Sequence, residues 1–476
     1  MDAERALALS TEMWDTTILP ALSAYIEIPN QSPDFDPEWE SNGHMDAAVG
    51  VMVEWVKAQK VEGLTLQVLK EPGRTPLIFG IIEASSPTAG GESEKSALLY
   101  AHLDKQPPMT EDWAEGLGPY TPVVKEGRLF GRGGADDGYG IFAAITAVKT
   151  VQDQGLPHGR MVLLVEASEE SSSVDLPHYV ETLAGDIGDV DLVVCLDSGA
   201  SNLDCLWSTT SLRGCVNVEL KVSVLDDGVH SGAASGIVPD TFRIARALLN
   251  RVEDAESGRV IGDVFYTDIP PLRMEQATRA GEILGSTISD CFPWKAGVVP
   301  VVDDPVEKLL NKTWRPTLTV TGADGLPPTA SAGNVLRRST TLKLSVRLPP
   351  TVDSAEATAY LRAELTRDPP YGAHVEVTGD HSGSGWEAPP EPAWLLAAMN
   401  DASQAFYGND AGFIGEGWSI PFLKMLNNRY PAAGMICAGV LDGFANAHGP
   451  NESFDIAYAK KLSACIGFIL AQHAHQ

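Results

Sequence analysis

Seven histidine and acidic side chains follow short apolar runs of this chain or lie in a glycine-rich turn, and side chains of these types bind metal ions. They are His102, Asp104, Asp136, Glu169, Glu170, Asp197 and His448. Short apolar runs between turn signals are typical of buried strands in a mostly parallel sheet. The binding crevice of an open α/β sheet lies outside the carboxyl ends of its strands. We therefore expect these side chains to meet at one sheet edge and form a metal site.

The first pair, His102 and Asp104, is separated by one residue. Residues two apart in a strand face the same side, so Asp104 can orient His102. A metal-bound histidine usually donates its second N–H to a carboxylate or a carbonyl. Taken alone, the pair could equally be a strand-end histidine beside a solvated acid.

The turn 131–138 (GRGGADDG) opens a predicted helix and contains two adjacent acids, Asp136 and Asp137. Its glycines could suggest a phosphate site, but no Gly-Lys-Ser/Thr follows and two carboxylates would repel a phosphate. A cation suits the turn better. One of the two acids could instead be the N-cap of the helix.

Glu169 and Glu170 are expected at a strand end, where adjacent side chains of extended backbone point in opposite directions. One carboxylate could bind a metal while the other accepts a proton from a water that the metal acidifies. The alternative is two exposed acids on a loop.

The donor set contains carboxylates and imidazoles but no cysteine, which suits Zn²⁺, with Mn²⁺ or Co²⁺ as substitutes. Asp197 and His448 would each be ordinary loop residues if they stood alone. With five ligands and a bridging aspartate, two ions about 3.5–4 Å apart fit better than one.

Composition narrows the class of protein. The 476-residue chain has a formal net charge of −30 and no clusters of Lys and Arg, which argues against nucleic acid as a partner. It has no run of about 18 apolar residues, so no membrane helix is expected. The first 27 residues lack the pattern of a secretory signal. Six cysteines without a Cys-x-x-Cys pair fit a reducing compartment, so we expect a cytoplasmic protein.

The first half alternates helical and strand patterns, which predicts an α/β fold with a mixed, mostly parallel sheet flanked by helices. Helices are expected at 4–27, 44–60 and 138–153. Strands are expected at 64–70, 76–83, 97–102, 161–166 and 192–196.

After Gly214 the apolar residues alternate with period two, which is typical of half-exposed antiparallel strands. The expected order is β-α-β-β-α-β, with helices at 240–251 and 354–366 and an inner strand at 317–320. We therefore predict an inserted α+β domain at 214–386 between two parts of a catalytic domain, 1–213 and 387–476. Segment 254–316 is expected to be an embellishment of the insert, and Gly379–Pro392 a return hinge.

Together these motifs resemble the M20 metallopeptidases, in particular the carnosinase-like dipeptidase branch. The resemblance implies a di-zinc exopeptidase fold with a ferredoxin-like lid that also forms a homodimer. It further implies that Asp136 bridges two metals, that His102 and Asp197 complete one site and that Glu170 and His448 complete the other. Glu169 is then the general base, Asp104 orients His102, and the Asp136–Asp137 peptide is cis.

The resemblance also implies roles for lid and loop residues. His230 would stabilise the oxyanion in the active site of the neighbouring subunit, and Arg347 would bind the substrate carboxylate. Asn334 and Ser419 match positions near the substrate.

The expected reaction is therefore hydrolysis of short peptides with a free carboxylate, of dipeptidase or carboxypeptidase type, by a hydroxide held between two metals. The alternative substrate class is N-acyl amino acids, with Trp207 or Trp418 lining an acyl pocket. A binding module without activity is a different class, which the intact Glu169 and ligands disfavour. A serine hydrolase is disfavoured because no Gly-x-Ser-x-Gly elbow is present.

Overall fold

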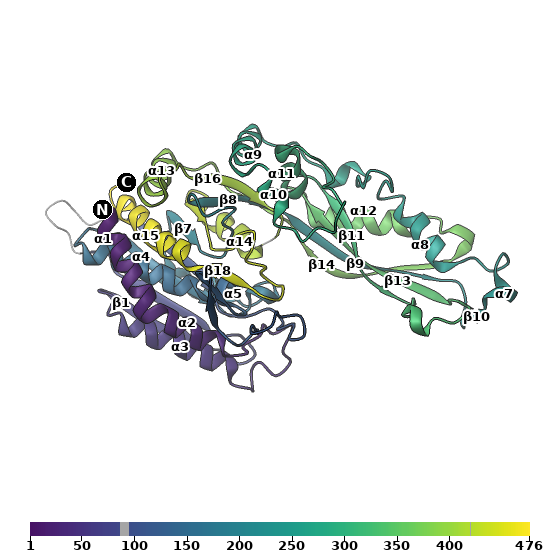
Figure 1. Ribbon diagram of the computed structural model, residues 1–476, viewed down its shortest axis with the longest axis horizontal. Coiled ribbons are helices and arrows are strands. Elements are labelled where there is room, and N and C mark those ends of the chain that lie inside the picture. Colours follow the sequence, from purple (N-terminus) through teal and green to yellow (C-terminus); the bar gives the residue numbers. More distant parts are fainter. Residues whose placement is uncertain (86–94, 419) are drawn as a thin grey trace.

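The computed structural model of this protein describes residues 1–85, 95–418 and 420–476. The molecule is elongated, with a sheet covered by helices at one end and a smaller α+β unit at the other (Figure 1). Both chain termini lie at the end that carries the larger sheet (Figure 1). None of the described helices has the length and apolar character needed to cross a membrane.

The large sheet has six strands in the order β1-β2-β6-β3-β7-β17. The β1–β2 and β2–β6 pairs are antiparallel, and the other pairs are parallel. The mixed, mostly parallel sheet expected from the sequence is thus confirmed. The strands are β1 (Leu64–Leu69), β2 (Leu77–Ile82), β3 (Ser96–His102), β6 (Arg160–Glu166), β7 (Leu192–Cys195) and β17 (Gly434–Cys437).

Helices cover both faces of this sheet, which explains why its inner strands β3, β6 and β7 are buried at nearly every position. Residues 97, 99 and 101 of β3 pack into one core, and residues 98 and 100 pack into the other. The first core is closed by α1 (Ala3–Met13), α2 (Leu19–Ile26), α3 (His44–Ala58), α4 (Gly140–Asp153), α13 (Ala393–Tyr407) and α15 (Ile456–His473). The second is closed by α5 (Leu176–Thr182), α6 (Ala184–Ile187) and α14 (Pro421–Arg429).

The smaller unit, which we call the lid, is built on a four-stranded antiparallel sheet in the order β11-β13-β9-β14. Two helices, α8 (Thr241–Leu249) and α12 (Ser354–Thr366), pack on one face of it. The chain order of these elements is the expected β-α-β-β-α-β. The strands are β9 (Gly214–Ser223), β11 (Thr317–Asp324), β13 (Ser339–Leu348) and β14 (His374–Gly383).

Two details of the lid differ from expectation. Strand β11 lies at the sheet edge rather than inside it, because β13 pairs with both β11 and β9 and so takes the inner position. Strand β14 continues to Gly383, so the expected hinge Gly379–Pro392 begins as paired strand. At the far end of the lid, β10 (Val229–His230) pairs with β12 (Val335–Leu336), next to α7 (Ser231–Ala234).

Part of the segment 254–316 packs outside the lid sheet. Helices α9 (Pro271–Leu284) and α11 (Pro305–Thr313) contact β16 (Gly412–Glu416), with α10 (Thr287–Asp290) between them. Strand β16 pairs with β8 (Trp207–Leu212), which also pairs with β15 (Trp386–Glu387). These helices therefore lie where the lid joins the larger unit (Figure 1). The boundaries proposed at 213/214 and 386/387 stay predictions.

A third small sheet brings distant parts of the chain together beside the large one. Its strands are β4 (Val123–Lys125), β5 (Arg128–Phe130) and β18 (Ser453–Asp455), in the order β18-β5-β4. Because β5 pairs with β18, the glycine-rich turn that follows β5 lies next to the loop that precedes β18.

Candidate metal centre

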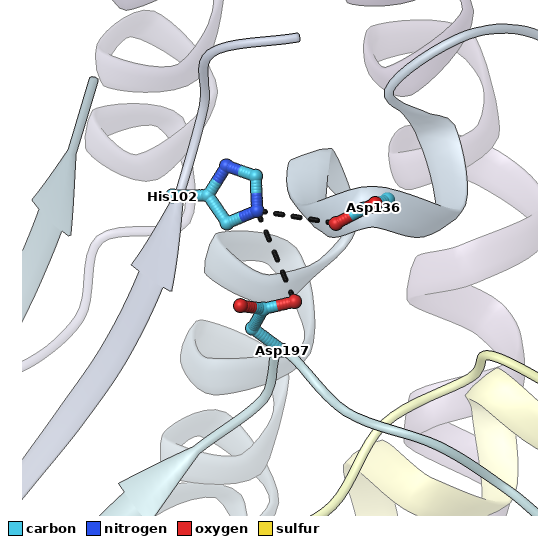
Figure 2. Close-up of side chains that lie close together, drawn as sticks. All are labelled: His102, Asp136 and Asp197. Atoms are coloured by element: carbon cyan, nitrogen blue, oxygen red, sulfur yellow. Dashed lines mark hydrogen bonds and ion pairs between the residues drawn. The ribbon is translucent and has the colours of Figure 1, made fainter. Parts of the chain in front are cut away.

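The first group of potential ligands consists of His102, Asp136 and Asp197, whose ligand atoms lie within 4.8 Å of one another. His102 is the last residue of β3, and Asp197 follows the end of the neighbouring strand β7. The His102 Nε2 atom is 3.2 Å from Asp136 Oδ1 and 3.8 Å from Asp197 Oδ1 (Figure 2). Three segments far apart in sequence thus direct donor atoms at one point.

The second group consists of Asp136, Glu170 and His448, again with ligand atoms within 4.8 Å of one another. His448 Nε2 is 3.1 Å from Asp136 Oδ2 and 3.4 Å from Glu170 Oε2. Asp136 therefore belongs to both groups and presents one carboxylate oxygen to each. This is the arrangement that two neighbouring cations with a shared carboxylate require.

Asp104 contacts residues of both ligand groups. Its Oδ1 lies 3.4 Å from His102 Nδ1, the ring nitrogen that faces away from Asp136. The same carboxylate accepts the backbone N–H groups of Glu169 and Glu170, at 3.1 and 3.0 Å. Asp104 is fully buried, so one side chain lies against the imidazole and also holds the glutamate turn.

The sequence analysis expected extended backbone at the two glutamates, and this expectation is wrong. Strand β6 ends at Glu166, and Glu169–Ser171 form a 3₁₀ turn whose first two N–H groups Asp104 accepts. The two side chains nevertheless take different positions: Glu170 joins the second ligand group, and Glu169 lines the adjoining cavity.

The turn that carries Asp136 requires glycine at position 133, where the backbone passes close to a neighbouring side chain. Gly133 has φ of +75°, and a Cβ there would lie 2.5 Å from the Lys105 side chain. The Asp136–Asp137 peptide is cis, as the resemblance implied. Asp137 is not a helix cap, because its Oδ2 accepts the backbone N–H of His102, at 3.2 Å.

A buried ion pair that the sequence analysis did not single out supports this turn. Arg132 Nη1 is 2.7 Å from Glu452 Oε2, and both side chains are 1% exposed. The Glu452 carboxylate also accepts the backbone N–H groups of Gly133, Ala135 and Asp136. The only sequence signals were a charged residue between glycines and an acid four positions after His448.

Arg132 extends the support to the second ligand group. Its Nη2 donates to the backbone carbonyls of His448 and Gly449, at 3.3 and 2.8 Å, and its Nε donates to that of Pro107. Glu452 and Arg132 therefore hold the Asp136 turn and the His448 loop together.

Burial and mutual repulsion perturb the acids of the centre. Burial raises the pKa of Glu170 to about 8 and that of Asp197 to about 7, and the charge of Asp136 adds to both shifts. The pKa of Glu169 is also raised, by burial and then by Asp197. Asp136 differs: burial opposes its ionisation, but hydrogen bonds from His102 and His448 hold its pKa well below the ordinary value.

These residues fit divalent cations. Several carboxylates share a small buried volume. Within the described part of the chain, no Lys or Arg side chain forms an ion pair with their ligand atoms. The buried Glu170 Oε1 has no hydrogen-bond partner among the described residues. Oxygen and imidazole donors without thiolate are the set expected for Zn²⁺ or Mn²⁺. The loops and strand ends converge on a centre whose charge a cation would balance.

A cavity of about 280 Å³ opens beside both ligand groups. Glu169 lines it together with Asp136, Asp197 and His448, and Trp418 forms part of its wall. The expectation that Trp207 lines an acyl pocket is wrong, because its side chain is fully buried and its indole N–H donates to Asn202. Trp418 is the tryptophan that faces the site.

The lid residues are placed away from the ligand groups within one chain. His230 lies in β10, at the end of the lid farthest from the large sheet (Figure 1), and its side chain is exposed. Asn334 is nearby, since its carbonyl accepts the backbone N–H of Ser231, at 2.9 Å. Arg347 lies on β13, near the junction with the large unit. Ser419 lies outside the described residues.

The fold and the site define a metal-dependent peptidase, and sequence comparison gives the family. The model of peptidase family M20/M25/M40 matches residues 98–471. The chain therefore belongs to this family, as the motifs indicated.

Two relatives that are named as dipeptidases match most of this chain. The chain is 26% identical over 437 residues to the cysteinylglycine-S-conjugate dipeptidase of Corynebacterium striatum, covering 90% of both proteins. It is 27% identical over 377 residues to the Beta-Ala-His dipeptidase of Rattus norvegicus, covering 77% of this chain and 75% of that protein.

Solved structures show the same fold. The di-peptidase Dug1p from Saccharomyces cerevisiae superimposes with a TM-score of 0.79 and 21% identity, over 100% of both chains. Human carnosine dipeptidase 1 gives a TM-score of 0.77 and 19% identity, over 100% of this chain and 99% of the other.

Proposed function

We propose that this protein is a dipeptidase that hydrolyses the amide bond of short peptides with a free carboxylate, using two divalent metal ions. The observation that carries the proposal is the pair of ligand groups that share Asp136 beside a cavity lined by Glu169. The relatives named as dipeptidases support the substrate class. The metal ions we propose are Zn²⁺, with Mn²⁺ or Co²⁺ as functional substitutes.

Two bound cations would polarise the scissile carbonyl and acidify a water molecule. His102 and Asp197 would hold one of them, Glu170 and His448 the other, and Asp136 both. Asp104 keeps the His102 ring in place through its contact with Nδ1.

Glu169 is proposed to transfer a proton from the water molecule to the leaving amine. Its side chain lines the cavity but belongs to neither ligand group, so it is free to accept a proton from water and return it to the leaving amine. Its backbone N–H is held by Asp104, which fixes the turn that carries it.

The lid is proposed to complete the site. Arg347 would bind the substrate carboxylate through its planar fork of N–H donors. His230 lies in β10, at the end of the lid farthest from the large sheet (Figure 1), and Asn334 directly precedes β12, which pairs with β10. We therefore propose a homodimer in which they reach the site of the partner, where His230 stabilises the oxyanion. Ser419 is likewise proposed to contact the substrate, as the resemblance implies.

A cytoplasmic location is proposed on the state of the cysteines. All six are free, and Cys195, Cys205, Cys437 and Cys465 are buried. Free buried thiols without a disulfide framework fit a reducing compartment.

The test is a substrate panel with enzyme loaded with Zn²⁺, Mn²⁺ or Co²⁺ after removal of its native metal. Dipeptides, tripeptides, N-acyl amino acids and dipeptide amides would be compared by kcat/KM. The proposal expects dipeptides with a free carboxylate to be the best substrates and the chelated enzyme to be inactive. A preference for N-acyl amino acids would instead support the aminoacylase alternative, for which Trp418 offers an apolar wall. Full activity in chelator would overturn the proposal.

A further inference from the structure

A second cavity, of about 240 Å³, adjoins the cavity beside the metal centre, and we call it the side cavity. Trp418, Leu441 and Asp442 line both cavities, so the two spaces meet at these three side chains. The other lining residues of the side cavity are distinct from Glu169 and from the candidate metal ligands. The side cavity is therefore a separate space within reach of a molecule that is bound at the metal centre.

One wall of the side cavity comes from segment 254–316, which was expected only as an embellishment of the lid. The segment contributes Leu284 from α9, Ile288 from α10 and Leu309 from α11. This wall is anchored to the neighbouring sheet by a buried arginine of α9. Arg273 is 3% exposed, and its Nε atom lies 3.2 Å from Glu387 Oε1 on β15. The three helices therefore hold the wall in a fixed position beside β16.

Trp418 stands at the boundary between the two cavities and is held there by neighbours on both units of the wall. Lys312 Nζ of α11 lies 5.3 Å from the centroid of the indole ring, which is the distance of a cation–π contact. A Cβ at Gly199 would lie 3.3 Å from Trp418 Cζ2, so the indole packs closely on the backbone there. Gly199 follows the candidate ligand Asp197 by two residues. The indole thus separates the metal centre from the side cavity.

The charged side chains of the side cavity are paired. Lys312 Nζ lies 2.6 Å from Glu416 Oε2, and Asp442 Oδ2 lies 2.6 Å from Arg128 Nη1. A charged group that entered the cavity would lose its hydration without meeting a free counter-charge in the described part of the lining. The rest of the lining is mostly apolar, so an apolar side chain is the group that this space suits.

The place of the side cavity selects one residue of the substrate. In the proposed reaction, the carboxylate of the C-terminal residue binds Arg347 on the lid sheet, and the metal ions polarise the carbonyl of the N-terminal residue. The side chain of that N-terminal residue branches from the carbon next to the polarised carbonyl. It therefore lies beside the metal centre, where the side cavity adjoins. Among the described residues, the four strands of the lid sheet contribute nothing to the lining.

We propose that the side cavity binds the side chain of the N-terminal residue of the dipeptide and makes the enzyme prefer large apolar residues, such as leucine, at that position. The proposal rests on the proposed dipeptidase function and deepens it by naming a substrate class. It assigns Ile288 as a residue that determines specificity, because Ile288 lines the side cavity from α10 and not the cavity beside the metal centre. The helices of segment 254–316 then select the substrate.

The first test compares four dipeptides on the metal-loaded wild-type enzyme: leucyl-glycine, alanyl-glycine, glycyl-leucine and glycyl-alanine. The kcat/KM for leucyl-glycine should exceed that for alanyl-glycine by roughly 10- to 100-fold, because an apolar pocket discriminates by the methylene groups it buries. The two substrates with N-terminal glycine should differ by much less. A preference for leucine at the C-terminal position alone would overturn the proposal.

The second test fills the side cavity. Ile288→Trp should lower kcat/KM for leucyl-glycine by roughly 10- to 100-fold and leave that for alanyl-glycine nearly unchanged. Ser201→Phe fills the same space from the opposite wall and should act alike if the first variant fails to fold. The matched control is Ile283→Trp, since Ile283 is a 43% exposed residue of α9 outside the lining. An unchanged ratio between the two substrates in either folded filling variant would overturn the proposal.

A binding measurement separates this inference from the proposed function. Calorimetric titration of the metal-loaded Glu169→Gln protein with leucyl-glycine and alanyl-glycine needs no turnover. Leucyl-glycine should bind roughly 10-fold more tightly or better, and adding Ile288→Trp should abolish the difference. That result, in a protein whose wild type cleaves no dipeptide, would leave the side cavity assigned and refute the dipeptidase. Normal cleavage of both dipeptides with equal affinities would refute the side cavity and leave the dipeptidase.

Discussion

Arg132 and Glu452 form a buried ion pair, with 2.7 Å between Nη1 and Oε2, that joins the Asp136 turn to the His448 loop. The two residues are 320 positions apart in sequence. Neither is proposed to bind a metal. We expect this pairing to keep Asp136 and His448 close enough together to share a cation.

Replacing Glu452 by Gln is expected to weaken metal binding as well as the fold. The variant leaves Arg132 buried without its counter-charge, which typically costs about 3–5 kcal/mol of unfolding free energy. Loss of support around metal ligands typically lowers affinity about 10- to 100-fold. Urea unfolding and calorimetric titration with Zn²⁺ would measure the two effects.

The control for this variant is Glu307→Gln, which breaks the ion pair with Arg315, of similar length at 2.6 Å but with side chains 46% and 35% exposed. Exposed pairs contribute about 0–1 kcal/mol, so this change should leave both measurements nearly unaltered. Equal effects of the two substitutions would contradict a special role for Glu452.

Glu169→Gln is expected to lower kcat while the protein still binds metal. Gln fills the same space but cannot accept a proton, and loss of a general base typically costs about 10²–10⁴-fold in rate. Steady-state kinetics with a dipeptide, together with metal analysis of the purified variant, would check this. The exposed Glu62→Gln serves as control. A variant as fast as the wild type would show that Glu169 is not the base.

Removing the metal is expected to invert the pH dependence of stability. Burial raises the pKa of Glu170 to about 8 and that of Asp197 to about 7, above their ordinary values of 4.5 and 3.8. At pH values between the ordinary and the raised pKa of each group, the metal-free native state therefore binds more protons than the unfolded state. Its stability falls as pH rises through this range. His448 acts in the same direction. Burial opposes its protonation, but Asp136 and Glu170 raise its pKa to about 9, so its contribution fades between pH 6.5 and 9.

Thermal unfolding of chelator-treated protein should thus give a higher Tm at pH 5.5 than at pH 8.5. Metal-loaded protein should show the opposite order, because cations bind the deprotonated ligands. The same order in both forms would mean that the acids of the centre do not control its stability.

Subunit complementation tests the proposed role of His230. His230→Ala and Glu169→Gln homodimers should each be nearly inactive. Co-refolded as an equal mixture, the chains should regain about one quarter of wild-type activity, since half of the C₂ dimers would be mixed and each would hold one complete site. No recovery, in a sample shown by mass analysis to contain mixed dimers, would contradict the exchange of His230 between subunits.

Much of the candidate ligand set could be predicted from the sequence. Each ligand follows an apolar run or lies in a glycine-rich turn, and the alternation of patterns puts strand ends at one edge. His102 at the end of β3 and Asp197 after β7 are direct outcomes of this rule. The period-two strands and the two helices of the lid were equally visible, because half-buried strands alternate strictly.

Other features could not be read from local pattern. The 3₁₀ turn of Glu169 depends on Asp104, which accepts its N–H from another strand end. The edge position of β11 depends on which strand pairs with β9, and a strand's own residues do not fix its neighbours. The burial of Trp207 follows from packing against Gly412, where an added Cβ would touch the indole ring at 2.5 Å.

The sequence by itself determined the donor chemistry, since the residue types at the strand ends limit the centre to oxygen and imidazole ligands. Only the tertiary structure decided that Asp136 shares its two oxygens between separate groups and that Arg132 and Glu452 hold those groups together. The physical reason is that sequence fixes which groups a strand end presents, whereas burial and charge balance depend on neighbours hundreds of residues away.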